Sequence, residues 1–237
     1  MARRIITQVQ GDLTGDGLPE IVRLTGERME DSAAWTEISL EIQQGGSCKA
    51  QRFALPENAG YSPRLILAPI TAADKQDVIT VIDSGGSGGI GYYTVFSYLN
   101  NEYRMIFDSE AYAAANPARV DYADGYAAWV TAGETAYALS LLGKGAAYLA
   151  ELYDASGVLR APQTGFVSPI GLLYPADFNG DGRMELALYR QISGLYRADG
   201  LGELITVLQW DGAAFTLYWQ TAGADAAEER PAGARGE

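Results

Sequence analysis

The chain has 237 residues, of which 17 are Lys or Arg, 30 are Asp or Glu and none is His, so its net charge at pH 7 is −13. The lack of His and the single cysteine, Cys48, exclude the Ser-His-Asp triad, the Cys-His pair, His-ligated metals and multi-cysteine zinc or iron–sulfur sites. The negative charge disfavours nucleic acids and anionic membranes as partners and favours cations.

The composition, with 48% hydrophobic and 20% charged residues, is typical of a folded globular chain. We expect one domain over residues 1–221 and a disordered tail over 222–237, where charges mix with small residues without an apolar period. No apolar stretch reaches about 18 residues, so membrane insertion is not expected. The apolar region after Met1 is too short for a signal peptide, which leaves a cytoplasmic location and an exported location after removal of a leader both open.

Short apolar runs and period-two patterns recur along the chain and predict strands. In chain order they cover residues 20–24, 36–42, 78–82, 92–99, 103–107, 127–130, 136–141, 186–189, 204–210 and 215–219. Asn100-Asn101 and Asp211-Gly212 each lie between two runs and predict tight hairpins, because these residues tolerate positive φ. Ala-rich segments at 110–116 and 146–153 predict one short helix each. The expected class is therefore all-β.

An internal similarity relates residues 11–22 to residues 176–187, which align without a gap. Residues 68–79 have the same length and the same trailing apolar strand, but Pro69 and Ala73 stand where carboxylates are expected. Asp121 to Gly125 lies near the remaining place in the series. A repeat of about 55 to 60 residues would fit about four times, which predicts a propeller-like array of antiparallel sheets in about four units.

Acidic and amide side chains alternate in both intact copies, as oxygen ligands do around Ca²⁺. The predicted ligands are Asp12, Thr14, Asp16, the carbonyl of Leu18 and Glu20 in the first copy, and Asp177, Asn179, Asp181, the carbonyl of Arg183 and Glu185 in the second. Each loop supplies three carboxylates against two positive charges, and an Asn in place of a Thr predicts tighter binding by the second. Two structural calcium ions are expected; ordinary Asx/Gly turns are the alternative.

An EF-hand is excluded, because position twelve of the loop is Arg23 in one copy and Leu188 in the other. The residues instead resemble the FG-GAP/VCBS repeats of integrin-like β-propellers, found in bacterial proteins of spore-forming Gram-positive lineages. That resemblance rests on the segment from Asp177 to Glu185 and on residues 58–63, 82–89 and 171–178. It implies calcium bound between strands of a blade, no catalytic activity and a place at the cell or spore surface. A third ion at Pro69 to Asp77 is in doubt, since only Thr71 and Asp77 match there.

The 15 Tyr and four Trp suggest a surface for a protein or glycan partner, with Tyr92, Tyr93, Tyr196 and Trp219 as candidates, although aromatic residues also fill sheets. We expect a calcium-binding, non-enzymatic scaffold for binding or surface assembly. One alternative is an acid–base hydrolase that uses two carboxylates, for which Asp83, Asp199 and Glu203 are candidates. The other is a structural protein that self-assembles through exposed strand edges.

Overall fold

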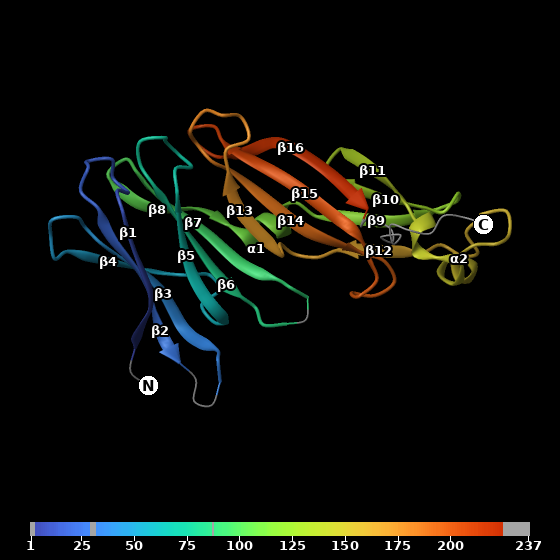
Figure 1. Cartoon of the computed structure of the whole chain (residues 1–237), viewed down its shortest axis with the longest axis horizontal. Coiled ribbons are helices and arrows are strands. Elements are labelled where there is room, and N and C mark those ends of the chain that lie inside the picture. Colours follow the sequence, from blue (N-terminus) through green and yellow to red (C-terminus); the bar gives the residue numbers. More distant parts are fainter. Residues whose placement is uncertain (1–2, 29–31, 87, 225–237) are drawn as a thin grey trace, which may run out of the picture. The chain divides into compact units, whose positions relative to one another are not determined.

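The computed structural model describes residues 3–28, 32–86 and 88–224, which form an all-β chain with antiparallel sheets and short helices (Figure 1). The strands are β1 (Arg4–Gly11), β2 (Glu20–Arg28), β3 (Trp35–Gln43), β4 (Ala50–Ala54), β5 (Tyr61–Ala68), β6 (Asp77–Asp83), β7 (Gly91–Leu99), β8 (Glu102–Asp108), β9 (Ala118–Ala123), β10 (Ala127–Ala132), β11 (Thr135–Ser140), β12 (Thr164–Val167), β13 (Leu172–Ala176), β14 (Glu185–Ser193), β15 (Gly200–Trp210) and β16 (Phe215–Ala224). The helices are α1 (Ser109–Ala115), α2 (Ala146–Leu152) and a 3₁₀ turn at Leu142–Lys144.

All ten predicted strands and both predicted helices are present. The hairpin at Asn100-Asn101 is confirmed, because both residues have positive φ, 52° and 65°, and β7 pairs with β8 across them. Six further strands were missed, namely β1, β4, β5, β9, β12 and β13. Most of these are short or have mixed polarity, so their apolar alternation is weak.

The described residues form three sheets, with orders β1-β2-β3-β4, β5-β6-β7-β8 and β11-β10-β9-β12-β14-β15-β16, and β13 pairs with β14 in the third. The expected array of about four similar units is not confirmed by these sheets of four, four and eight strands. The described chain divides into two compact units. Unit 1 comprises the described residues up to Ala115 together with 169–189 and 206–219, and unit 2 comprises 116–168, 190–205 and the described residues from Gln220.

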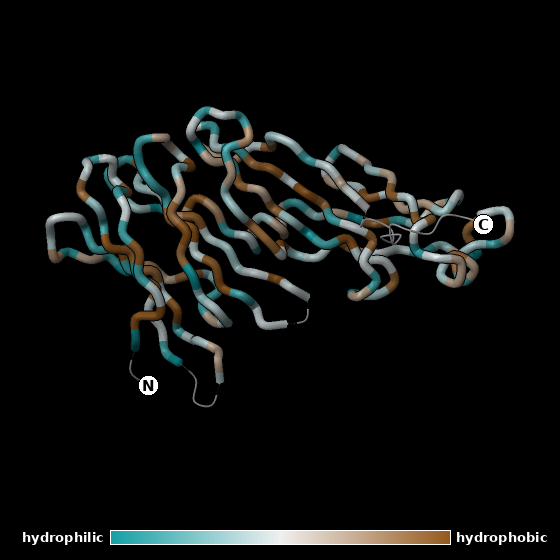
Figure 2. Tube along the Cα trace, viewed as in Figure 1, coloured by the Kyte–Doolittle hydropathy of each residue, from teal (hydrophilic) through white to brown (hydrophobic). Residues whose placement is uncertain are grey.

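Unit 1 is layered around the β5–β8 sheet, whose central strands β6 and β7 are buried on both faces. Six of the seven residues of β6 are buried, as its continuous apolar run predicts for a central strand. Val78 and Ile82 pack against Leu24, Leu40 and neighbours from the β1–β4 sheet. Figure 2 shows how apolar residues follow the strands of these sheets.

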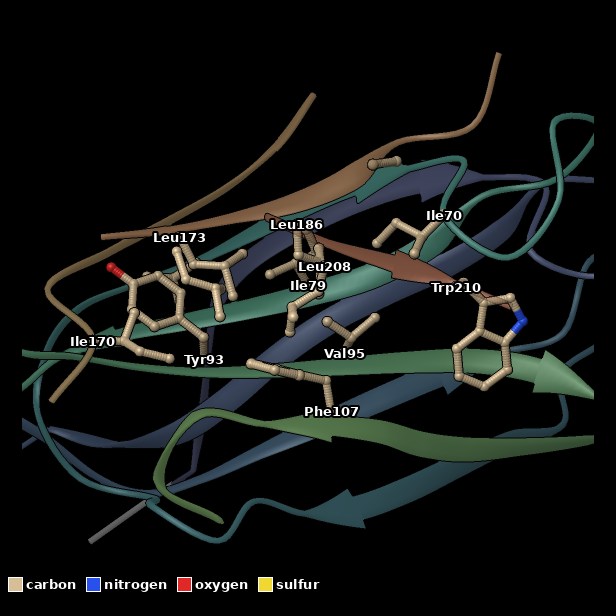
Figure 3. Packing of buried hydrophobic residues seen from close by; sticks show 13 residues of the cluster. Ile70, Ile79, Tyr93, Val95, Phe107, Ile170, Leu173, Leu186, Leu208 and Trp210 are labelled. Carbon is tan, nitrogen blue, oxygen red and sulfur yellow. The ribbon is translucent and has the colours of Figure 1, made fainter. Parts of the chain in front are cut away.

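The opposite face of the β5–β8 sheet packs against parts of β13, β14 and β15 (Figure 3). Ile79 and Tyr93 of the middle sheet meet Leu173, Leu186 and other residues of those strands, and Trp210 closes one end of the cluster. Complete burial of each such side chain contributes roughly 1.5–3 kcal/mol to the stability of the fold. Because successive side chains of β6 and β7 point to opposite faces of the middle sheet, these two strands hold the three layers together.

Unit 2 has its own core, in which Val120, Val130, Leu141, Tyr153 and Ile192 are among the buried residues. Asp199 is a buried polar residue of this unit; its carboxylate accepts hydrogen bonds from Leu195 N–H at 2.9 Å and Tyr148 Oη at 2.8 Å and pairs with Lys144 Nζ at 2.7 Å. Burial raises the pKa of Asp199, but these contacts outweigh it and hold the pKa below its ordinary value. Strand β16 continues to Ala224, so three residues of the predicted tail are ordered in a strand, and residues 225–237 lie outside the described residues.

Candidate functional site

Three loops of unit 1 share one construction, and they are the two intact copies and the divergent copy of the repeat. In each, the carboxylate at position nine begins a strand and accepts a hydrogen bond from the backbone N–H at position two. The bonds join Leu13 to Glu20 at 2.8 Å, Ile70 to Asp77 at 3.1 Å and Phe178 to Glu185 at 2.8 Å. These three carboxylates are 0%, 0% and 3% exposed, so each is a buried clamp that closes its own loop.

A second repeated contact joins each loop to the next. The backbone N–H at position eight of the middle loop, on Gln76, donates to the carbonyl of Asp12 at position one of the first loop, at 2.8 Å. The N–H of Met184, at position eight of the last loop, donates in the same way to the carbonyl of Pro69 at 2.7 Å. The three loops therefore lie in a row at one end of the layers of unit 1.

The first loop directs its carboxylates at backbone amides. Asp12 accepts from Gly15 N–H at 2.7 Å and from Gly17 N–H at 2.8 Å, and Asp16 accepts from Leu18 N–H at 2.8 Å. Desolvation raises the pKa of Asp12, but the hydrogen bonds from Gly17 and Gly15 outweigh it, and the pKa lies below its ordinary value. Within the described ranges, no Lys or Arg forms an ion pair with a carboxylate of this loop.

Glu20 also fastens the first loop to the turn between β3 and β4. Its second carboxylate oxygen accepts from Gly45 N–H at 3.1 Å. A Cβ added to Gly45 would lie 2.9 Å from the carbonyl oxygen of Leu18, so only glycine allows this approach. One buried carboxylate thus positions two segments that are distant in sequence.

The middle loop carries its own cation. Lys75 Nζ lies 3.1 Å from Asp77 Oδ1 and donates to Ser97 Oγ at 2.9 Å, and the Lys75 side chain is only 11% exposed. Asp77 also accepts from Thr71 N–H at 2.6 Å. In the middle loop the Lys75 ammonium therefore supplies the positive charge that a calcium ion was predicted to supply in the two intact copies.

The last loop is also compensated. Asp177 accepts from Gly180 N–H at 2.6 Å and Gly182 N–H at 3.0 Å. Asp181 accepts from Arg183 N–H at 2.8 Å and pairs with the Arg183 guanidinium at 2.9 Å, and both contacts hold its pKa below the ordinary value. The Asn179 amide is placed with Nδ2 3.3 Å from Asp181 Oδ2 and 2.9 Å from Glu185 Oε1.

The structure thus brings the predicted ligands of each loop together but pairs their oxygens mainly with N–H groups. Among the described residues, Asp and Glu side chains form no group of three or more placed to hold a metal ion. Calcium stays a prediction. The fourth place in the repeat does not share the construction: Asp121 lies in β9, and Asp124 accepts from Leu159 N–H at 2.8 Å.

An apolar groove lies beside the last loop, and we call it the aromatic groove. Phe178, at position two of the loop, lines it together with Tyr218 and Trp219 of β16, and its volume is about 500 Å³. The three side chains are 45%, 43% and 48% exposed. The sequence analysis named Trp219 but missed Phe178, whose signal is an aromatic residue inside an otherwise polar loop.

The other aromatic candidates do not line this groove. Tyr93 is buried in the core of unit 1, with its hydroxyl donating to the carbonyl of Gly171 at 2.9 Å, and Tyr92 is half-buried. Tyr196 is 62% exposed and belongs to unit 2.

Two of the three carboxylates proposed for a hydrolase are held in ion pairs. Asp83 pairs with Arg64 at 2.9 Å, and Asp199 is held by Lys144 as described above. Glu203 is exposed, as is the free thiol of Cys48. A carboxyl that sequence reasoning missed is Glu110 in α1, whose Oε1 is buried without a protein partner in the described chain. Burial, with the nearby charges of Glu57 and Asp108, raises its pKa.

No helix in the described part of the chain is long and apolar enough to cross a membrane.

Comparison with known proteins places the chain in a family. A family model described as the YybI C-terminal domain matches residues 116–223. "Uncharacterized protein YybI" of Bacillus subtilis (strain 168) is 43% identical over 222 residues, which cover 93% of this chain and 85% of the relative. No solved structure matches. The resemblance to FG-GAP/VCBS repeats was wrong, because the matching family is a different one, and short Asp- and Gly-rich turns of this kind also occur outside those repeats. The chain belongs to the YybI family.

Proposed function

We propose that this chain is a non-enzymatic β scaffold that binds a glycan through the aromatic groove. The observation that carries the proposal is the grouping of three exposed aromatic side chains around one groove of about 500 Å³. Aromatic rings offer a flat apolar face that can stack on the C–H face of a sugar, and Tyr and Trp add a polar tip. Exposed large apolar groups gathered in one place are typical of binding surfaces.

The groove is held in shape by the loop beside it. The buried Glu185 carboxylate accepts from Phe178 N–H, so the backbone of Phe178 is fixed while its ring remains exposed. A preorganised surface loses less conformational entropy on binding. The net charge of −13 favours a neutral glycan over a second copy of the chain, which would repel the first.

The test is binding to insoluble and soluble polysaccharides, measured by co-sedimentation and by affinity gel electrophoresis. We expect Trp219→Ala and Phe178→Ala to weaken binding at least tenfold. Trp129→Ala is the matched control, because Trp129 is 45% exposed and belongs to unit 2. A failure to bind any polysaccharide, or equal binding by all variants, would contradict the proposal. Capture of one protein through a photo-cross-linker at position 219 would replace the glycan by a protein partner.

A second proposal concerns calcium and favours the first loop over the last. Asp181 and Asp77 already have Arg183 and Lys75 as counter-charges, whereas Asp12, Asp16 and Glu20 have no ion-pair partner among the described residues. A Ca²⁺ ion would offset this charge once some of the oxygens turned away from their amide partners. The sequence analysis favoured the last loop because Asn179 is a stronger ligand than Thr14, and it left the positive charge of Arg183 out of account.

Thermal melts in EGTA and in ~2 mM Ca²⁺, with Mg²⁺ as control, test this proposal. Occupancy at a hundred times the dissociation constant stabilises the folded chain by about 2.7 kcal/mol. We expect Asp16→Asn to abolish the calcium-specific rise and Asp181→Asn to preserve it. No rise in the wild-type chain would leave all three loops as metal-free turns.

A further inference from the structure

A small polar cavity lies beside the first loop of unit 1, and we call it the polar pocket. Its volume is about 210 Å³. Residues from the first loop, from the ends of β3 and β4 and from the β7–β8 hairpin line it: Thr14, Ile42, Gln44, Lys49, Gln51, Tyr98, Asn101 and Tyr103. Ile42 is buried and Thr14, Tyr98 and Tyr103 are half-buried, whereas the amides and Lys49 are exposed at the rim.

Two hydroxyls of the pocket lack protein partners. Thr14 Oγ1 and Tyr103 Oη are both buried, and neither reaches a donor or acceptor of the described chain. Buried polar groups almost always have a hydrogen-bond partner, and each one left without a partner costs about 1–3 kcal/mol. Both residues line the polar pocket, so its occupant is the nearest candidate partner for the two hydroxyls.

The electrostatics of the pocket indicate which occupant it suits. Burial raises the pKa of Tyr103 well above its ordinary value, and the negative charges of Glu20, Asp16 and Asp12 add to the effect. The phenol is therefore protonated at neutral pH and able to donate a hydrogen bond. The same carboxylates oppose an anion near Tyr103, and Lys49 opposes a cation at the rim.

The walls of the pocket are fixed by the clamp already described. Glu20 binds the N–H groups of Leu13 and Gly45, which are the chain neighbours of Thr14 and Gln44. On the other side, the Tyr103 ring packs on Tyr98 at 4.9 Å and on Phe53 at 6.1 Å between centroids. The two orphan hydroxyls are therefore held in place on separate, rigid segments.

We infer that the polar pocket binds a neutral, hydroxyl-rich ligand of the size of a single sugar ring. Hydroxyls, side-chain amides and one ammonium offer donors and acceptors, and Ile42 and the tyrosine rings offer apolar contact. About seven water molecules, at ~30 Å³ each, would also fill this volume, so the alternative to a ligand is a pocket that holds only water. The pocket and the aromatic groove have no lining residue in common, and the inference does not rest on the proposed function.

The experiment is titration of the full chain with neutral monosaccharides, N-acetylglucosamine and inositol, followed by saturation-transfer NMR and calorimetry. Gluconate serves as the anionic probe. Tyr103→Phe and Thr14→Val each remove one hydroxyl with little change of shape, and we expect each to weaken binding by roughly two- to tenfold. Gln51→Ala removes a lining amide at the exposed rim of the pocket, and it replaces Tyr103→Phe or Thr14→Val as the test variant if either of these is unstable. Tyr196→Phe and Trp129→Ala, both in unit 2, are controls expected to bind normally, in EGTA as in Ca²⁺.

Saturable binding of a neutral sugar or polyol, weakened by Tyr103→Phe and Thr14→Val at unchanged melting temperature, would support the inference. Three results would overturn it. The first is binding of a neutral probe that neither Tyr103→Phe nor Thr14→Val weakens, and the second is tighter binding of gluconate than of every neutral probe. The third is no binding at millimolar concentrations, which would mean that water alone is the partner of the two hydroxyls. Loss of polysaccharide binding in Trp219→Ala would bear on the aromatic groove alone.

Discussion

Removal of the Glu20 carboxylate should destabilise unit 1 more than most single substitutions. Glu20 is 0% exposed, and its two oxygens accept from Leu13 N–H at 2.8 Å and from Gly45 N–H at 3.1 Å. A hydrogen bond to a charged acceptor contributes about 1.5–3 kcal/mol, so Glu20→Ala should cost about 3–6 kcal/mol. Glu20→Gln keeps one carbonyl oxygen and should cost about half as much.

Urea unfolding and amide hydrogen exchange measure this effect. We expect a lower midpoint in Glu20→Ala and faster exchange of the Leu13 and Gly45 amides, while the amides of Ile70 and Phe178 in the sister loops keep their protection. Glu102→Ala is the matched control, because Glu102 is exposed and should change stability by no more than about 0.5 kcal/mol. A cost below about 1 kcal/mol for Glu20→Ala, or equal costs for Ala and Gln, would refute the clamp.

Three further perturbations test other contacts. Folding lowers the pKa of Asp199, so its contribution to stability is complete above the unfolded pKa of about 3.9 and is lost as the pH falls through the folded value. Asp199→Asn should therefore make the free energy of unfolding depend less steeply on pH in the acid range. An unchanged pH dependence would contradict this role of Asp199. Lys75→Met should lower the free energy of unfolding, measured by urea denaturation, by about 3 kcal/mol, because it leaves the buried Asp77 carboxylate without its ion-pair partner. The double variant Lys75→Met/Asp77→Asn should recover part of this loss. The absence of any recovery would argue against the ion pair. Gly45→Ala should cost about 1–3 kcal/mol from its contact with Leu18, whereas Gly86→Ala, which meets nothing closer than 4.0 Å, should be neutral.

Much of the site could be predicted from the repeat, because its geometry is local. Glu20 was placed correctly at the start of a strand, and the Asp12 and Asp177 loops do turn back on their own carboxylates. The roles of Lys75 and Arg183 were missed, although both stand at position seven of a repeat copy. A basic side chain there can reach a carboxylate at position five or nine of its own loop, which a search for metal ligands ignores.

Residues at equivalent positions of the repeat copies also lie in different surroundings, and the repeat pattern could not predict this difference. Leu13 and Phe178 both occupy position two, yet Leu13 is 1% exposed in a core and Phe178 is 45% exposed in the aromatic groove. The polar pocket joins Thr14 to Tyr103, which are distant in sequence, and no pattern pairs them.

The sequence by itself determined the all-β class, most strands, both short helices, the Asn100-Asn101 hairpin and the tight turns of the repeat loops, since each depends on alternation or turn chemistry within a few residues. Only the tertiary structure decided the three sheets, the division into two units, the link from Glu20 to Gly45 and the two cavities. These features depend on which distant segments pack together. Apolar patterning shows that a strand has a buried face, but many partners of similar shape could cover it, so the pairing is selected by the summed packing of the whole chain.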